Sequence, residues 1–436
     1  MTPRARRVLL VAQLAPPSPL VAARRVAGLA KYVSRLGFEI TVLTSRISGE
    51  GEIEGAAGVV RTPDLMSSRL NWRRGHFRAL SGSSAATYAK PSRLQSVLVP
   101  DVAAATWVPF AVPRALALAR RDRVDCVLTT GPAHSAHLVG LALRRRGVPW
   151  IAELRDGWTF DQPHRSFPLA AQRRLDAALE RSVAERADAL VGVTEPIAQD
   201  LRDRFGGIVE MLTNAFDPGE TPAQDGDELP LDPDRFSVVH TGRLAYSGST
   251  PRPLVEGVRL LRREHPEVAA RLEVVLAGPL SAEEAALLEA EDVAGIIHPV
   301  GTLGRGPTLA LQRAADALLV VTEGQIRPSV ATGKLFEYLA AGPPIVVLGE
   351  GTEAARIVEE AKAGFAASAT DAPAIAAAFA RVVTSAPPGA SSRDVERYSY
   401  PAIAGRYAQL IERVIEAKPQ RRGKNSASAA ATSRGR

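Results

Sequence analysis

The chain has 436 residues, of which 46% are hydrophobic and 23% are charged. A chain of this length can form two domains that each bury a core, and the composition is typical of a globular protein in water. We find no apolar run that approaches the roughly 18–20 residues needed to cross a bilayer. The single cysteine, Cys126, lies in the apolar run 124–128, which predicts a buried, inert thiol and excludes a disulfide within the chain.

The formal net charge of +7 is concentrated at the two ends of the chain. Three arginines precede the first predicted strand, and six lysines and arginines lie in residues 417–436. These nine charges exceed the total, so the rest of the chain is close to −2. The composition of residues 418–436 predicts a disordered basic tail with a weak attraction for anionic lipid. At the other end of the chain, the apolar run 8–12 is too short for a secretory signal. We therefore expect a cytoplasmic protein, with peripheral contact at the inner face of the membrane left open.

Strand and helix patterns alternate through the first half of the chain. Strands are predicted at 8–12, 39–44, 125–129, 150–154 and 189–193, and helices at 20–36, 103–121, 135–146 and 170–186, followed by a last helix–strand pair that ends at Thr213-Asn214. Strands separated by helices of this length indicate a doubly wound parallel sheet.

In such a sheet, ligand-binding groups gather just after the carboxyl ends of the strands. The positions concerned are Gly131 with His134, Arg155-Asp156, Thr194-Glu195 and Asn214. Asp156 is the most suggestive, because charged residues follow an apolar strand abruptly; a structural Arg–Asp pair that caps the strand is the alternative. His134 and His137 can share a helix face, but no carboxylate at ligand spacing accompanies them, so no metal site is predicted.

The segment Ser67–Pro100 differs from the rest in composition, since it combines six basic residues with three aromatic ones and contains no acid. Such a segment suits an acceptor-binding or membrane-surface face, and a solvated loop is the alternative. Without a recognisable nucleic-acid-binding module, we do not expect a nucleic-acid partner.

Residues 217–234 contain seven acids and no Lys or Arg, which indicates a linker between two domains. A second alternating pattern follows it. Strands are predicted at 236–240, 272–277, 296–300, 317–321 and 345–348, and helices at 253–263, 282–289, 308–314 and 400–417. After the first of these strands comes Gly242-Arg243, where the glycine permits close backbone approach and the arginine can reach a phosphate.

The most informative stretch is 331–348, a helix that runs into a buried strand. Thr332 can serve as the N-cap, and Lys334 and Glu337 stand three apart in the first turns. Free N–H groups and the positive end of the helix dipole favour a phosphate there. An ammonium and these N–H groups can hold a diphosphate while the carboxylate accepts hydrogen bonds from ribose hydroxyls. A surface Lys/Glu pair on an ordinary helix is the alternative.

Two other nucleotide-binding motifs are poorly matched. A P-loop needs glycine where Pro328 stands and Ser or Thr where Leu335 stands. A dinucleotide-binding domain needs a glycine-rich first turn, but residues 13–19 contain three prolines and no glycine. The glycines of 301–306 have the wrong spacing, and that run is predicted to be a plain loop.

Several segments, in this order, resemble the GT-B glycosyltransferases, in particular the family-4-like group, over residues 8–416. The matching pieces are Pro16-Pro17, Arg25 with 29–32, 125–132, 153–158, 212–217, 240–244 and 332–338. The resemblance implies an α/β GT-B fold, with two doubly wound Rossmann-like domains facing each other across a cleft. It divides the chain into an N-terminal acceptor-side domain (1–216), the linker (217–234), a nucleotide-sugar-binding domain (235–399), a helix that returns to the first domain (400–417) and the tail.

The resemblance also implies a hexosyltransferase-like, retaining transfer from a nucleotide-diphosphate sugar to a glycan, polysaccharide-precursor or lipid-linked acceptor of the cell envelope, without an obligate metal. In this interpretation Arg243 and Lys334 hold the donor diphosphate and Glu337 binds the ribose. The expected catalytic residues are Asp156, Arg243 and Lys334. The expected donor-binding residues are Gly242, Arg243, Thr332, Gly333, Lys334, Leu335 and Glu337.

The sequence departs from the family pattern at three places. Ser329 replaces a donor-sugar glutamate, prolines replace the glycine-rich first loop, and Arg155-Asp156 stands near the position of a family histidine. The donor sugar therefore stays open. A sugar-nucleotide epimerase of similar fold and a catalytically silent GT-B binding protein are the alternatives.

Overall fold

The computed structural model describes residues 4–18, 20–65, 97–160, 167–220, 222, 229–244, 250–289, 293–322, 329, 331–385, 389 and 392–417. Most of the basic, aromatic segment Ser67–Pro100 and all of the tail 418–436 lie outside these residues, so the predictions made for them stay predictions.

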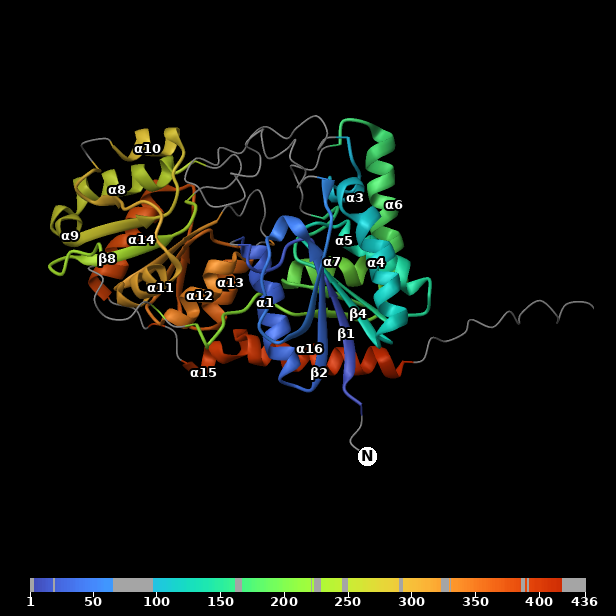
Figure 1. Cartoon of the computed structure of the whole chain (residues 1–436). Helices are drawn as coiled ribbons and strands as arrows, with labels where there is room; N and C mark the ends of the chain where they lie inside the picture. Colours follow the sequence, from blue (N-terminus) through green and yellow to red (C-terminus); the bar gives the residue numbers. More distant parts are fainter. Residues whose placement is uncertain are drawn as a thin grey trace, which may run out of the picture.

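The N-terminal domain is a parallel sheet of seven strands with helices on both faces (Figure 1). Its elements are β1 (Arg6–Val11), α1 (Val21–Ser34), β2 (Phe38–Ser45), η1 (Arg46–Ser48), β3 (Ala56–Thr62), α3 (Ala103–Thr106), α4 (Val108–Arg121), β4 (Cys126–Thr130), α5 (Ala136–Arg144), β5 (Trp150–Leu154), α6 (Ala170–Arg186), β6 (Ala189–Gly192), α7 (Glu195–Phe205) and β7 (Val209–Met211). The strand order is β3-β2-β1-β4-β5-β6-β7. From β1 the chain adds strands first toward one edge of the sheet and then, from β4 on, toward the other edge, as in a doubly wound fold.

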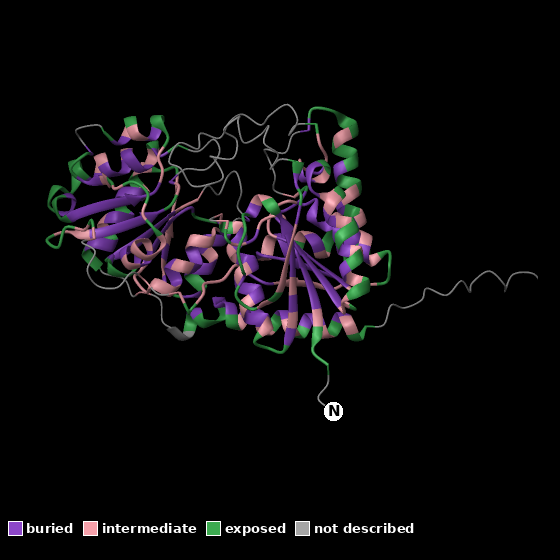
Figure 2. Ribbon diagram, viewed as in Figure 1, coloured by how far each residue is buried: buried purple, intermediate pink, exposed green. Residues whose placement is uncertain are grey.

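The C-terminal domain is a second parallel sheet, with six strands in the order β10-β9-β8-β11-β12-β13. Its elements are β8 (Phe236–Thr241), α8 (Arg252–Glu264), α9 (Pro266–Arg271), β9 (Leu272–Ala277), α10 (Ala282–Leu288), β10 (Ile297–Pro299), α11 (Arg305–Ala314), β11 (Ala317–Val321), α12 (Gly333–Ala341), β12 (Ile345–Leu348), α13 (Glu353–Glu360), β13 (Gly364–Ala367), α14 (Ala372–Ser385), α15 (Ser392–Val395), η3 (Glu396–Tyr398) and α16 (Tyr400–Glu416). The central strands are buried on both faces, which explains their continuous apolar runs (Figure 2).

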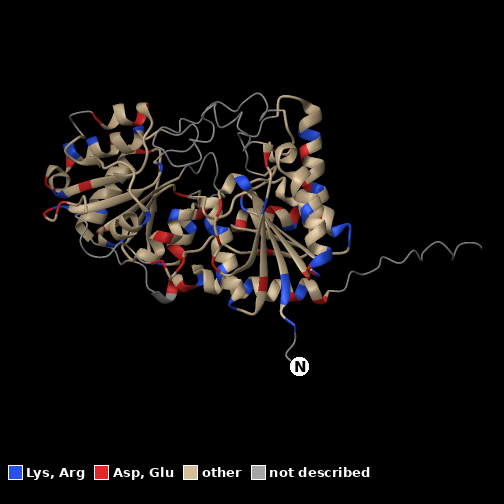
Figure 3. Cartoon of the chain, in the orientation of Figure 1, with Lys and Arg blue, Asp and Glu red and all other residues tan. Residues whose placement is uncertain are grey.

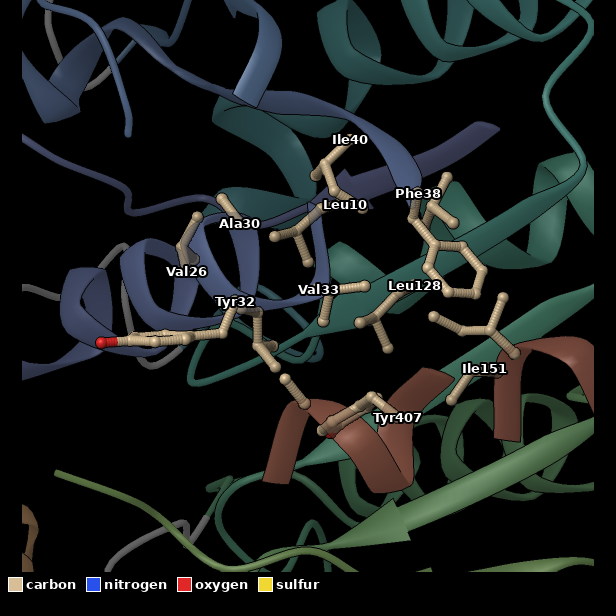
Figure 4. Packing of buried hydrophobic residues seen from close by; sticks show 14 of the residues in the cluster. Leu10, Val26, Ala30, Tyr32, Val33, Phe38, Ile40, Leu128, Ile151 and Tyr407 are labelled. Atoms are coloured by element: carbon tan, nitrogen blue, oxygen red, sulfur yellow. The ribbon is translucent and has the colours of Figure 1, made fainter. Parts of the chain in front are cut away.

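The last helix, α16, packs against the N-terminal domain. Its Tyr407 is buried beside Leu128 and Ile151 of the first sheet and Val33 of α1 (Figure 4). The chain thus passes between the domains twice, and the two passages lie side by side, because Phe216 pairs with Ser399 in an isolated β-bridge.

A buried ion pair fixes this arrangement. The Arg25 guanidinium of α1 donates to Glu153 Oε1 of β5 from Nη2 at 2.6 Å and from Nε at 2.9 Å, and the Tyr407 hydroxyl donates to the same oxygen at 2.6 Å. Arg25 also donates to the carbonyls of Leu212 and Thr213. Because every partner is buried and bonded, the cluster joins α1, β5 and α16 in one geometry.

The structure corrects some predicted elements. The predicted helix 103–121 is two helices, because Pro109 has no N–H for the carbonyl of Ala105 and lies instead in the first turn of α4. Trp107, between the two helices, donates from Nε1 to Thr62 Oγ1 at 2.9 Å. The prediction of a plain loop over 301–306 is wrong at its end, since α11 begins at Arg305; Pro307 is tolerated there because N–H groups in a first turn need no partner in the helix.

Other elements were missed. The sequence reading placed no strand at β3 or β13 and no helix at α9, α13 or α14. The short strand expected to end at Thr213-Asn214 ends at Met211. Among the described residues, no helix is both long and apolar enough to span a membrane.

Candidate functional site

The side chain of Lys334, in the first turn of α12, reaches the carboxyl end of β8. The sequence predicted that Lys334 and Gly242-Arg243 meet at a donor diphosphate. Its Nζ donates to the backbone carbonyl of Arg243 at 3.0 Å and lies 3.0 Å from His240 Nε2. A side chain at Gly242 would place its Cβ 3.7 Å from the same ammonium, so glycine keeps the backbone open at this point. The structure therefore brings Gly242, Arg243 and Lys334 together.

The hydrogen bonds define the protonation of His240. Burial, reinforced by the neighbouring Lys334, lowers the pKa of His240 to about 3, so the ring is neutral at pH 7. His240 Nδ1 lies 2.8 Å from the carbonyl of Leu319, and Nε2 lies 3.0 Å from the carbonyl of Arg243 as well as 3.0 Å from Lys334 Nζ. When Lys334 is an ammonium, Nε2 accepts from it, and the ring proton is then on Nδ1, which donates to Leu319.

Burial also acts on Lys334 itself. Desolvation lowers its pKa to about 7, and the nearby Glu337 carboxylate offsets only part of this effect. An anion placed against the ammonium would favour its charged form. Lys334 is therefore poised to become fully cationic when a phosphate binds.

The first residues of α1 and α12 lie against each other across the domain junction. A Cβ added to Gly333 would lie 3.1 Å from Val21 Cγ1. Thr332 is the N-cap of α12 as predicted, but its side chain does not cap the helix, and its buried Oγ1 has no hydrogen-bond partner among the described residues. Neither helix has a side-chain cap, so two uncapped helix N-termini meet next to Lys334, an arrangement that favours an anion.

Figure 3 shows that basic and acidic residues lie on helices of both domains. Glu337 lies one turn further along α12 than Lys334 and faces three donors. Its Oε1 accepts from Arg24 of α1, and its Oε2 pairs with Arg305 Nη1 at 2.9 Å and accepts from Gln312 Nε2 at 3.4 Å. Gln312 also donates to Thr241 Oγ1 at 2.9 Å, which connects Glu337 with the end of β8. Arg24, Arg305 and Glu337 line a small crevice beside Phe216 and Tyr400.

The remaining predicted residues take different positions. Asp156 is half-buried just after β5, at the carboxyl edge of the N-terminal sheet. The preceding Arg155 donates from Nη1 to the carbonyl of Ala22, in the first turn of α1, at 3.1 Å. The Leu335 side chain is fully buried in the core, and its N–H donates to the Thr332 carbonyl, so it offers no side-chain group to a ligand.

Sequence reasoning missed Arg24, Gln312 and Arg305. Gln312 could have been found, because it lies beside Leu311 and five residues before the next strand begins, where an amide on a buried face needs a polar partner. Arg24 gave no such signal: it precedes Arg25, which is fully buried, and only the structure separates their roles.

Comparison with known proteins decides the family. The description "Glycosyl transferase 4-like domain" matches residues 22–215, and "Glycosyl transferases group 1" matches residues 237–385. The chain is a GT-B glycosyltransferase of the family-4-like group. This GT-B glycosyltransferase therefore contains both domains of the family, in the order that its sequence motifs predicted.

Solved structures agree on the fold. The glycosyltransferase is similar to sucrose-phosphate synthase from Thermosynechococcus elongatus, with a TM-score of 0.65 and 17% identity over 94% of this chain and 100% of the other. A UDP-forming trehalose-phosphate synthase from Burkholderia xenovorans matches with a TM-score of 0.60 and 14% identity over 95% and 99% of the two chains. A putative UDP-N-acetylglucosamine 2-epimerase from Listeria monocytogenes matches with a TM-score of 0.54 and 14% identity over 94% and 97%. A search of curated proteins gives no match.

Proposed function

We propose that this glycosyltransferase moves a hexosyl group, with retention, from a nucleotide-diphosphate donor to a glycan, polysaccharide-precursor or lipid-linked acceptor of the cell envelope. The observation that supports it most is the convergence of the N-termini of α1 and α12 beside the buried ammonium of Lys334. Such a site suits two adjacent phosphates, since the helix dipoles and the ammonium all favour negative charge.

In this proposal each residue has a defined task. Lys334 and Arg243 hold the diphosphate, and the backbone at Gly242, Thr332 and Gly333 lets the phosphates approach. Glu337 accepts hydrogen bonds from the ribose hydroxyls. Asp156, which lies after β5 in the other domain, orients the acceptor hydroxyl.

The proposed reaction needs no reactant other than the donor and the acceptor. The bond between the sugar C1 and the phosphate oxygen breaks, and the acceptor oxygen bonds to C1 on the same face. The hydroxyl proton passes to the departing phosphate. Lys334 and Arg243 stabilise the charge that develops on this phosphate, so their contribution is electrostatic.

A thermal-shift screen with UDP-, GDP-, ADP-, CDP- and dTDP-sugars tests donor binding, because a bound ligand raises the melting temperature by mass action. We expect one nucleotide class to stabilise the protein. Lys334→Ala and Glu337→Ala should each weaken that binding by about tenfold, the loss of one charge-assisted hydrogen bond. Glu359→Ala, which removes an exposed carboxylate of α13, is the control and should behave as wild type.

Products distinguish the alternatives. If the enzyme releases nucleoside diphosphate when it is incubated with the nucleotide sugar that binds, the result supports the transferase. The fold shared with the Listeria epimerase makes epimerisation the second candidate, and epimer formation without release of nucleoside diphosphate would favour it. Donor binding without turnover would favour a silent binding protein.

The location of the enzyme is a further part of the proposal. We infer that it works in the cytoplasm, with Ser67–Pro100 and the tail 418–436 making weak contact with the anionic inner face of the membrane. Both segments are basic, and such segments bind anionic lipid through charge. Co-sedimentation with phosphatidylserine vesicles should decrease when the chain is ended at Ala417 and in high salt; equal sedimentation of both chains would contradict a role for the tail.

A further inference from the structure

Among the residues that the structure describes, one ion pair joins the proposed ribose-binding carboxylate to the other domain. Arg24 lies in α1 of the N-terminal domain and Glu337 in α12 of the C-terminal domain, and Arg24 Nη1 donates to Glu337 Oε1. The other oxygen of the carboxylate, Oε2, is taken by Arg305 and Gln312. Both oxygens of the Glu337 carboxylate thus have protein partners.

Binding of a ribose requires one of these cations to leave. Arg305 is also held by Glu220, so it keeps a carboxylate partner if Glu337 turns away. For Arg24, Glu337 is the only ion-pair partner among the described residues, and its side chain is 40% exposed, against 11% for Glu337. Arg24 is therefore the cation that a ribose displaces at the lower cost.

We propose that Arg24 is a positioning residue that closes the two domains over Glu337 until the donor takes its place. The inference rests on the proposed role of Glu337 in binding the ribose. Arg24 and the two ribose hydroxyls compete for the same carboxylate, so binding of the donor breaks the contact between α1 and α12. By reciprocity, the contact also lowers the affinity for the donor.

The first experiment measures nucleotide affinity. Isothermal titration of UDP, GDP, ADP, CDP and dTDP identifies the nucleoside diphosphate that binds. Arg24→Ala should increase its affinity by about two- to fivefold, the size expected for losing a partly exposed competing ion pair. Arg24→Lys should stay near wild type, and Arg35→Ala, which removes an exposed arginine paired with Glu54 at the end of α1, should have no effect. An unchanged or lower affinity for Arg24→Ala would overturn the competition.

The second experiment needs no nucleotide, so it separates a failure of this inference from a failure of the proposed function. Spin labels on cysteines placed at the exposed Ala178 of α6 and Ala286 of α10 report the distance between the domains. In the nucleotide-free protein, Arg24→Ala should broaden and lengthen this distance.

A Glu337→Gln background provides the matched control for that measurement, because it removes the charge that Arg24 holds. There, Arg24→Ala should cause no further change in the distance. A distance that is the same in wild type and Arg24→Ala, or an equal change in both backgrounds, would show that the pair does not hold the domains together.

Discussion

His240 Nε2 lies 3.0 Å from Lys334 Nζ, so a neutral imidazole and an ammonium share one hydrogen bond in the interior of the C-terminal domain. Because Nε2 accepts from the ammonium, the proton of His240 is on Nδ1, which donates to the carbonyl of Leu319. His240 thereby turns the amine toward the end of β8 without adding a second positive charge. The site that is proposed to receive a diphosphate consequently depends on the charge of Lys334.

The pH dependence of nucleotide binding follows from this arrangement. The pKa of Lys334 is about 7 in the free protein and rises when a diphosphate binds, because the anion favours the ammonium. Affinity for the nucleoside diphosphate should then fall by up to about tenfold per pH unit above pH 7, until the pKa of the complex is reached. Below pH 7 the contribution of Lys334 is constant.

Isothermal titration from pH 6 to pH 9 checks this expectation, and titrations in buffers of different ionisation enthalpy should show proton uptake near pH 8. In Lys334→Met this uptake should disappear. Proton uptake of the same size in Lys334→Met would assign it to another group.

Much of the frame could be predicted from the sequence. Strands β5, β9, β11 and β12 have the predicted bounds, because an apolar run closed by Gly, Pro or a charged residue is hard to misplace. β3 was missed because its Ala-Ala-Gly start breaks the strand pattern. α14 could have been predicted, because its buried Ile375, Phe379 and Val383 follow one another at helical spacing. At the site, the meeting of Lys334 with Gly242-Arg243 follows from parallel strands ending at one edge. The Arg24–Glu337 pair could not be predicted from the sequence, because it depends on how the two domains meet.

The buried pair Arg25–Glu153 gives a stability prediction. Both side chains are fully buried, so Arg25→Met leaves the Glu153 carboxylate without its main partner. We expect a loss of about 3–5 kcal/mol in the free energy of unfolding, measured by urea denaturation at pH 7. The double variant Arg25→Met/Glu153→Leu should be more stable than the single variant, because no buried charge remains. A double variant that is less stable than Arg25→Met would contradict a role for the unpaired charge.

The same pair predicts opposite responses to acid. Burial alone would raise the pKa of Glu153, but the charge of Arg25 holds it below its ordinary value. In wild type, the stabilisation from ionised Glu153 is present above the ordinary carboxyl pKa and is lost as the pH falls through the lower, folded-state pKa. In Arg25→Met burial dominates and the pKa is raised, so this group stabilises the protein at low pH and that contribution is lost as the pH rises. The stability difference between wild type and variant should shrink from pH 7 to pH 4.5, as measured by urea denaturation; a constant difference would mean that Glu153 does not titrate.

The contact between α1 and α16 can be tested with two glycines. A Cβ at Gly28 would lie 2.3 Å from the ring of Tyr400, so Gly28→Ala must displace α16 and should cost about 1–3 kcal/mol in thermal or urea unfolding. At Gly405, also within a helix, a Cβ would meet nothing within 4 Å, and Gly405→Ala should stabilise the protein by about 0.5–1 kcal/mol through helix propensity. Opposite signs are expected because one glycine is needed for close packing and the other is not. The cost of Gly28→Ala should shrink in a Tyr400→Ala background, since the ring that it meets is then absent; an equal cost in both backgrounds would place the strain elsewhere in α1.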